Sequence, residues 1–261
     1  MRVLAVHADA IVVVSDIWQT TCTAVRSGDE GFVIDSPILP NELDALPGLL
    51  EEARFPVSGL LCTHADWDHL LARLAFPQAS LGAGESSTVR LQAELGNAQR
   101  DLRAFDEEHY VQRAQPLALA GLQALPVPGH LALGPASELE LHAANGHTVD
   151  GTAYWIPWLQ MLVIGDYLSP VEIPMISPGG SITAYLATLE RLAPLVQQAR
   201  TVIPGHGGPL SREQARRLLE QDVDYLSALP RCGAATPLPG GRTTSEQKRI
   251  HAENVGTLAP G

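Results

Sequence analysis

The sequence of 261 residues predicts a globular fold of packed sheet and helix layers, of the α/β or α+β class. Short runs rich in β-branched residues fill the first third of the chain, and strand-like and helix-like segments interleave after it. Hydrophobic residues make up 45% of the chain, enough for a sizeable core. No apolar run approaches the roughly 20 residues that cross a bilayer.

Strand-like segments lie between polar or glycine-containing turns. In the first third they span residues 4–6, 10–14, 21–26, 32–35 and 58–62. Further along they span residues 79–83, 117–119, 122–127, 139–143, 153–156, 161–164 and 201–204. The segment 58–62 looks buried and is followed at once by a cluster of His and Asp residues, so we expect a strand to deliver this cluster to the edge of a sheet.

Helical patterns separate and follow these strands. Leucines give residues 42–55 a helical rhythm that Pro47 is expected to interrupt, and residues 86–111 form a polar helical cover beside the site. Clear apolar stripes predict helices over residues 183–198 and 211–229. Ser211 and Gln214 are spaced as a capping box for the second of these. A short helix is expected over residues 245–254.

Net charge and cysteine content exclude several classes of protein. The formal net charge of −12 disfavours sequence-independent binding to nucleic acid or to an anionic membrane. Three cysteines (Cys22, Cys62 and Cys232) without CxxC spacing predict neither a disulfide framework nor a structural zinc site. The N-terminal segment lacks the pattern of a signal peptide, so a cytoplasmic location is expected.

Four clusters of potential metal ligands carry the chemistry. They are His64-Ala65-Asp66-Trp67-Asp68-His69, Asn145-Gly146-His147-Thr148, Ile164-Gly165-Asp166-Tyr167 and Pro204-Gly205-His206-Gly207. In the last three, a glycine lets the backbone turn sharply so that the next residue can point into a crevice. Imidazole and carboxylate groups are natural ligands of zinc, iron and manganese. Seven such groups suffice for two ions with a shared carboxylate. The remaining histidines (His7, His109, His130, His142 and His251) are expected to be ordinary surface or hydrogen-bonded residues.

The motif order resembles that of the metallo-β-lactamase fold superfamily, whose signature HxHxDH is followed by a lone His, a lone Asp and a final His. The resemblance runs from the first strand to about residue 229. It implies an α+β fold, an αββα sandwich of two mixed sheets packed face to face with helices outside, over residues 1–229. The tail 230–261 is expected to pack on this domain. It also implies that His64 and His147 bind a first metal, that Asp68, His69 and His206 bind a second, and that Asp166 bridges them.

Asp66 departs from the family pattern, because it stands where the family most often has the second His. A carboxylate at this position is found, as Glu, in the flavodiiron branch. If Asp66 binds metal, three carboxylates against two divalent ions leave a charge of roughly +1 instead of roughly +2, which acidifies bound water less and favours iron or manganese over zinc. The alternative is that Asp66 does not bind and that only the second site is filled.

The expected function is metal-assisted hydrolysis of an ester, thioester, lactone, amide or phosphoester by two divalent ions, zinc first and iron or manganese as alternatives. Asp68 is expected to orient the attacking water, and Tyr167 to donate a hydrogen bond to substrate or simply to pack. The expected partner is a small molecule, and a homodimer is compatible with the sequence. The alternatives are a di-iron redox protein like the flavodiiron core without its flavodoxin domain, and a degenerate, metal-poor binding module.

Overall fold

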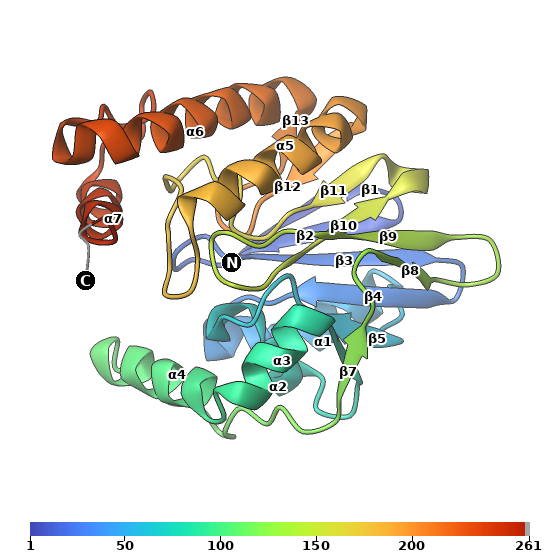
Figure 1. The fold of residues 1–261 in the computed structure, drawn as a ribbon. Coiled ribbons are helices and arrows are strands. Elements are labelled where there is room, and N and C mark those ends of the chain that lie inside the picture. The colour runs from blue at the N-terminus through green and yellow to red at the C-terminus, as the bar shows by residue number, and fades with distance from the viewer. Residues whose placement is uncertain (259–261) are drawn as a thin grey trace.

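The computed structural model describes residues 1–258 and shows an α+β fold in which two mixed sheets pack face to face between layers of helices (Figure 1). The fold class and the αββα arrangement predicted from the sequence are therefore confirmed. No helix within these residues is long and apolar enough to span a membrane.

The first sheet contains the N-terminal strands in chain order. They are β1 (Arg2–His7), β2 (Ala10–Val14), β3 (Thr21–Ser27), β4 (Glu30–Asp35), β5 (Gly59–Leu61), β6 (Leu81–Gly84) and β7 (Leu122–Leu125). Strands β1 to β4 pair antiparallel, and β4 to β7 pair parallel. The carboxyl ends of β4 and β5 therefore lie at one edge of the sheet.

The second sheet has the order β13-β12-β11-β10-β9-β8. Its strands are β8 (Gly129–Ala132), β9 (Glu138–Ala143), β10 (Thr152–Ile156), β11 (Met161–Val163), β12 (Thr201–Ile203) and β13 (Leu210–Ser211). Pairing is antiparallel except between β11 and β12, which are parallel. Because β9, β11 and β12 run in the same direction, their carboxyl ends also share one edge.

Strand β2 shows how the sandwich forms, because all of its residues are buried. Ala10, Val12 and Val14 join the core between the two sheets, whereas Ile11 and Val13 face the N-terminal helices. Side chains alternate along a strand, so a strand covered on both faces is apolar throughout. This explains why the apolar run at residues 10–14 shows no polar alternation.

The helices form the outer layers (Figure 1). On the first sheet lie α1 (Pro40–Glu52), α2 (Ala72–Ala75), α3 (Glu85–Ala93) and α4 (Asn97–Glu108). Helices α5 (Ile182–Gln198), α6 (Arg212–Cys232) and α7 (Ser245–Gly256) belong to the second half of the chain, and their apolar faces share one core cluster with the second sheet. Ser211 and Gln214 form the predicted capping box of α6.

The structure differs from the sequence predictions in several elements. Helix α1 continues through Pro47, although proline removes one backbone hydrogen bond. Burial of Leu46 and Leu50 stabilises the turns on either side of it. The segment 117–119 lies outside the strands, although Leu117 is buried in the core. Helix α6 runs three residues past the predicted boundary at residue 229.

Candidate metal centre

The ligand cluster after β5 sits on an irregular loop that ends in a short 3-10 helix, Trp67–His69. Asp66 is extended (φ −72°, ψ 142°) and precedes this turn, so its side chain leaves the loop in a different direction from those of Asp68 and His69. On a regular helix or strand, the side chains of His64, Asp66, Asp68 and His69 could not point toward two separate metal positions. The loop therefore contributes candidate ligands to two neighbouring groups of side chains.

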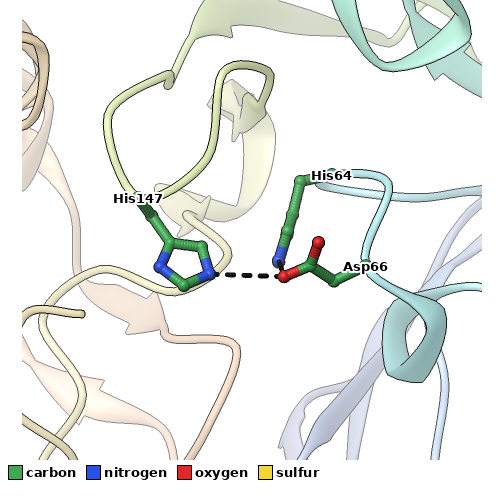
Figure 2. A group of neighbouring side chains, drawn as sticks. All are labelled: His64, Asp66 and His147. Atoms are coloured by element: carbon green, nitrogen blue, oxygen red, sulfur yellow. Dashed lines mark ion pairs between the residues drawn. The ribbon is translucent and has the colours of Figure 1, made fainter. Parts of the chain in front are cut away.

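The first group of ligand atoms consists of His64, Asp66 and His147. Asp66 Oδ2 lies 3.5 Å from His64 Nε2 and 3.5 Å from His147 Nε2. Figure 2 shows both rings directing a nitrogen at this carboxylate, although His147 comes from the loop after β9. Separations of this size between ligand atoms suit a single ion held at about 2.0–2.2 Å from each.

The second group consists of Asp68, His69 and His206. Asp68 Oδ2 lies 3.6 Å from His69 Nε2 and 3.5 Å from His206 Nε2. His206 reaches the group from the loop after β12, so this group also joins ligands from both sheets.

Asp166 lies between the two groups. Its Oδ2 is 3.6 Å from His64 Nε2, 3.3 Å from His147 Nε2 and 3.5 Å from His206 Nε2. Its Oδ1 is 3.2 Å from His69 Nε2. The structure therefore brings together all seven residues predicted as ligands, with Asp166 within 3.6 Å of histidines of both groups.

Two glycines allow the ligand loops to approach one another. A Cβ at Gly205 would overlap Asp166 Oδ1, and the adjacent His206 could not then take its place. Gly146, at φ 134°, lies against the backbone of Tyr185, and a side chain there would collide with α5. The glycines that precede the ligands are thus needed for close approach as well as for turning.

The protein holds the Nδ1 side of each histidine and leaves Nε2 facing the centre. His147 Nδ1 lies 2.9 Å from the carbonyl oxygen of Met175, and His206 Nδ1 lies 3.1 Å from that of Trp18. His69 Nδ1 lies 3.1 Å from Asp35 Oδ2. Such outer partners fix the ring orientation and raise the basicity of a metal ligand.

The buried atoms that face the centre fit a divalent metal. Nε2 of His64, His69 and His147 has no hydrogen-bond partner among the described residues, and neither has Asp166 Oδ1. Buried polar atoms without a hydrogen-bond partner are costly, and metal ions bound among these four atoms would satisfy them. The donor set of nitrogen and carboxylate oxygen is the one that zinc, iron and manganese take.

The comparisons with known proteins agree with this geometry. The family model described as Metallo-beta-lactamase superfamily matches residues 15–206, which cover most of the chain and all seven clustered side chains. The chain belongs to the metallo-beta-lactamase superfamily. The resemblance predicted from the motifs is therefore confirmed. No curated protein matches the sequence.

Solved structures of the superfamily resemble the chain in fold. TTHA1429 from Thermus thermophilus, a metallo-beta-lactamase family protein, is 19% identical with a TM-score of 0.69, over 97% of this chain and 95% of that one. A metallo-beta-lactamase from Pontibacter korlensis is 15% identical with a TM-score of 0.64, over 87% and 98%. TTHA1623, solved in a di-iron-bound form, is 20% identical with a TM-score of 0.60, over 79% and 97%.

In the metal-free protein the pKa values of three candidate ligands, His69, His147 and His206, are raised above the ordinary value of 6.5. Burial lowers the pKa of His147, but Asp66 and Asp166 outweigh burial and raise it from 6.5 to about 9. Burial also lowers the pKa of His206, which Glu172 and Asp166 raise to about 10. Burial raises the pKa of Asp66, yet His147 and His64 hold it well below its usual range. Without metal, the centre is held together by imidazolium–carboxylate pairs.

Metal uptake is therefore expected to release protons. At pH 7 the imidazoles of His147 and His206 are protonated, because their pKa values are about 9 and about 10, whereas a metal binds neutral imidazole. We expect apparent Zn²⁺ affinity to rise as the pH rises from 7 to 10. Calorimetric titrations at pH 7 in buffers of different ionisation enthalpy measure the protons released, and uptake without proton release would contradict these pKa values.

The same shifts predict the sign of the pH dependence of stability in the metal-free protein. A raised imidazole pKa stabilises the fold fully below the ordinary value of 6.5, and this contribution disappears as the pH rises through 9 to 10.

Sequence reasoning missed several residues around the candidate ligands, among them Asp35, Asp150 and Glu172. Asp35, at the end of β4, accepts hydrogen bonds from the backbone N and hydroxyl of Thr63 and lies against His69. Asp150 accepts from the backbone N of Ala65. Glu172 Oε1 lies 3.9 Å from His206 Nδ1. The available signal for Asp150 was its place three residues after His147.

Tyr167 is placed differently from the predicted substrate contact. It is buried, its hydroxyl donates to the carbonyl oxygen of Ala144 at 3.0 Å, and it accepts from the backbone N of His147 at 3.2 Å. Both hydrogen-bonding directions are thus used inside the protein, and the ring packs on Tyr185. The geometry favours the packing role, in which Tyr167 holds the loop that carries His147.

A cavity of about 660 Å³ opens onto the centre. Asp66, Asp68, His147, Asp166 and His206 lie in its lining. Its walls include Trp18, which is 45% exposed and packs edge-on against Trp67. The cavity is therefore large enough for a small organic molecule to reach both ligand groups.

Proposed function

We propose that the chain is a metal-dependent hydrolase that attacks an acyl group of a small molecule with a water activated at a two-ion centre. The observation that carries this proposal is the pair of ligand groups sharing Asp166 at the base of an open cavity. His64, Asp66 and His147 would hold one ion, Asp68, His69 and His206 the other, and Asp166 would contact both.

Bound divalent ions supply an acidified water and polarise the oxygen under attack. Asp68 is the residue best placed to orient that water, because it combines a ligand position with a place in the cavity lining. A carboxylate there can accept a hydrogen bond from the water and hold its lone pair toward the substrate. Trp18 and Trp67 supply an apolar wall for the rest of the substrate.

The charge of the cavity wall favours substrates without an anionic group. Asp101 and Glu172 line the cavity with carboxylates, and both of its arginines are already paired. Arg90 contacts Asp66 and Asp150, and Arg249 contacts Glu246 and Glu253. An anionic substrate would meet the carboxylate of Asp101, which forms no ion pair with the described residues. We therefore favour an uncharged ester, thioester, lactone or amide over a phosphodiester.

The test compares turnover of matched substrates by the Zn²⁺-loaded protein. We expect kcat/KM for an uncharged aryl ester, thioester or lactone to exceed that for an aryl phosphodiester by about tenfold or more, the ratio that about 1.4 kcal/mol of differential binding produces. Cleavage of the phosphodiester alone would overturn the choice of substrate. No cleavage of any substrate by fully loaded protein would overturn the hydrolase.

A charge variant isolates the effect of the wall. Asp101→Lys is expected to narrow the preference for uncharged substrates, because it places a cation in the cavity lining. Asp224→Lys, an exposed change on α6 outside that lining, is the matched control and should leave the preference unchanged.

A second candidate function is a di-iron redox protein. It is favoured by the carboxylate of Asp66 in the first ligand group and by the similarity of the fold to TTHA1623, which has been solved in a di-iron-bound form. Carboxylate ligands suit iron better than an all-histidine set does. Protein purified without added metal would then contain iron and show an absorption band that bleaches on reduction. Colourless, zinc-loaded protein with esterase activity would exclude it.

A further inference from the structure

Arg90 on α3 is the only arginine or lysine in direct contact with a candidate ligand among the described residues. Its Nη1 lies 2.8 Å from Asp66 Oδ1 and 2.9 Å from Asp150 Oδ1. The other oxygen of Asp66, Oδ2, is the one that faces His64 and His147. The two oxygens of Asp66 are thus divided between the arginine and the first ligand group.

We propose that Arg90 is a positioning residue that makes Asp66 bind the first ion through one oxygen only. The proposal rests on the two-ion centre proposed above. Arg90 occupies Oδ1, so Asp66 is held with Oδ2 aimed at the first ligand group. A guanidinium is permanently charged, so this contact does not depend on the pH, although Arg90 shares its charge between Asp66 and Asp150.

Asp150 holds Arg90 in this position. Its side chain is fully buried, its Oδ2 accepts from the backbone N of Ala65, and its Oδ1 accepts from the hydroxyl of Thr148 at 2.9 Å. Asp150 therefore ties the loop that carries Asp66 to the loop that carries His147. Because a buried carboxylate is costly without a counter-charge, Arg90 is also required to neutralise Asp150. One guanidinium thus connects both ligand loops.

The arrangement leaves the charge expected from Asp66 unchanged and fixes its geometry instead. Three carboxylates and two divalent ions leave roughly +1, and the charges of Arg90 and Asp150 beside the site cancel each other. Arg90 therefore acts on the first site by fixing which oxygen of Asp66 faces His64 and His147.

The test measures Zn²⁺ affinity directly, by competition with a chromophoric chelator, so that it does not depend on turnover. Arg90→Gln is expected to weaken the first site by about 10–100-fold, the range found when an outer partner of a metal ligand is removed. The second site, which Arg90 does not contact, is expected to change much less. Arg90→Lys should give an intermediate loss, because lysine restores the charge but not the planar fork. Arg216→Gln, an exposed arginine on α6, is the matched control.

A double-mutant cycle separates positioning of Asp66 from support of the fold. In an Asp66→His background, Arg90→Gln is expected to cost clearly less first-site affinity than in the wild type, since only the contact with Asp150 is then left to lose. Equal losses in the two backgrounds would mean that Arg90 only supports the loops, and this would overturn the proposal. An unchanged Zn²⁺ affinity of the first site in Arg90→Gln would overturn the proposal as well. A wild-type protein that binds fewer than two ions would contradict the two-ion centre. A protein that binds two ions but hydrolyses no substrate would contradict the proposed function and leave the role of Arg90 intact.

Discussion

Asp166→Asn is expected to lose both metal ions and all measurable hydrolysis. One oxygen of Asp166 lies within 3.6 Å of Nε2 of His64, His147 and His206, and the other lies 3.2 Å from Nε2 of His69. Asparagine keeps the shape of the side chain but removes the charge that both sites share. We expect each site to weaken by at least about a hundredfold, the upper range for loss of an outer partner alone. Elemental analysis after dialysis measures the ions retained.

Two further variants show whether the effect is specific. His206→Ala or His69→Ala should remove the second-site ion and turnover, since both histidines belong to the second ligand group. His130→Ala, an exposed histidine on β8 that pairs with Glu138, should retain both ions. A folded Asp166→Asn protein with two ions per chain would contradict the bridging assignment.

Arg242→Ala is expected to destabilise the fold by about 3–5 kcal/mol, because removal of one partner leaves a buried charge uncompensated. Arg242 and Asp222 are 3% and 1% exposed, and their side chains approach to 2.6 Å. Arg242 also donates to the carbonyl oxygens of Ser169 and Glu172, on the loop beside the candidate centre. Chemical denaturation measures the free energy of unfolding.

The loss should depend on pH in a defined direction. Burial raises the pKa of Asp222 to about 7 even though Arg242 opposes the rise. A carboxyl whose folded pKa is raised from 3.8 to about 7 lowers the stability progressively over that interval. Without Arg242 the pKa rises further, so the loss continues above pH 7 in the variant, and the penalty of Arg242→Ala should be larger at pH 8 than at pH 5.

Two controls separate the buried pair from surface charge. Arg242→Met with Asp222→Leu should recover most of the stability, because the unpaired charge is gone. Arg216→Ala breaks only an exposed pair with Glu220 and should change stability by less than about 1 kcal/mol. An Arg242→Ala protein as stable as the wild type would contradict the prediction.

The fold, and the gathering of the candidate ligands in one place, could be predicted from the sequence, since both depend on local signals. His64, His147 and His206 each follow a strand, and parallel strands bring such positions to one edge. Strand β2 is read correctly because its β-branched residues are buried on both faces. The predicted strand at 117–119 fails because apolar residues there fill the core without a neighbouring strand.

The supporting residues could not be predicted from the sequence, because their roles depend on contacts between distant segments. Arg90 lies on a polar helix, and only the packing of α3 places it 2.8 Å from Asp66. Asp35 resembles any acidic residue at a strand end until its contact with His69 appears. Strand β8 was not predicted, because Gly129 and His130 have little preference for a strand. The strand forms because its backbone pairs with that of β9.

Each candidate ion site takes ligands from both sheets: His64 to His69 follow a strand of the first, and His147, Asp166 and His206 follow strands of the second. A bound ion is therefore a cross-link between the N-terminal and C-terminal halves of the chain. Ligand binding adds RT ln(1 + [L]/Kd) to the stability of the folded state, about 2.7 kcal/mol at a hundredfold excess over Kd. The free energy of unfolding would then rise or fall with the concentration of available metal. The lifetime of the folded protein would change in the same direction.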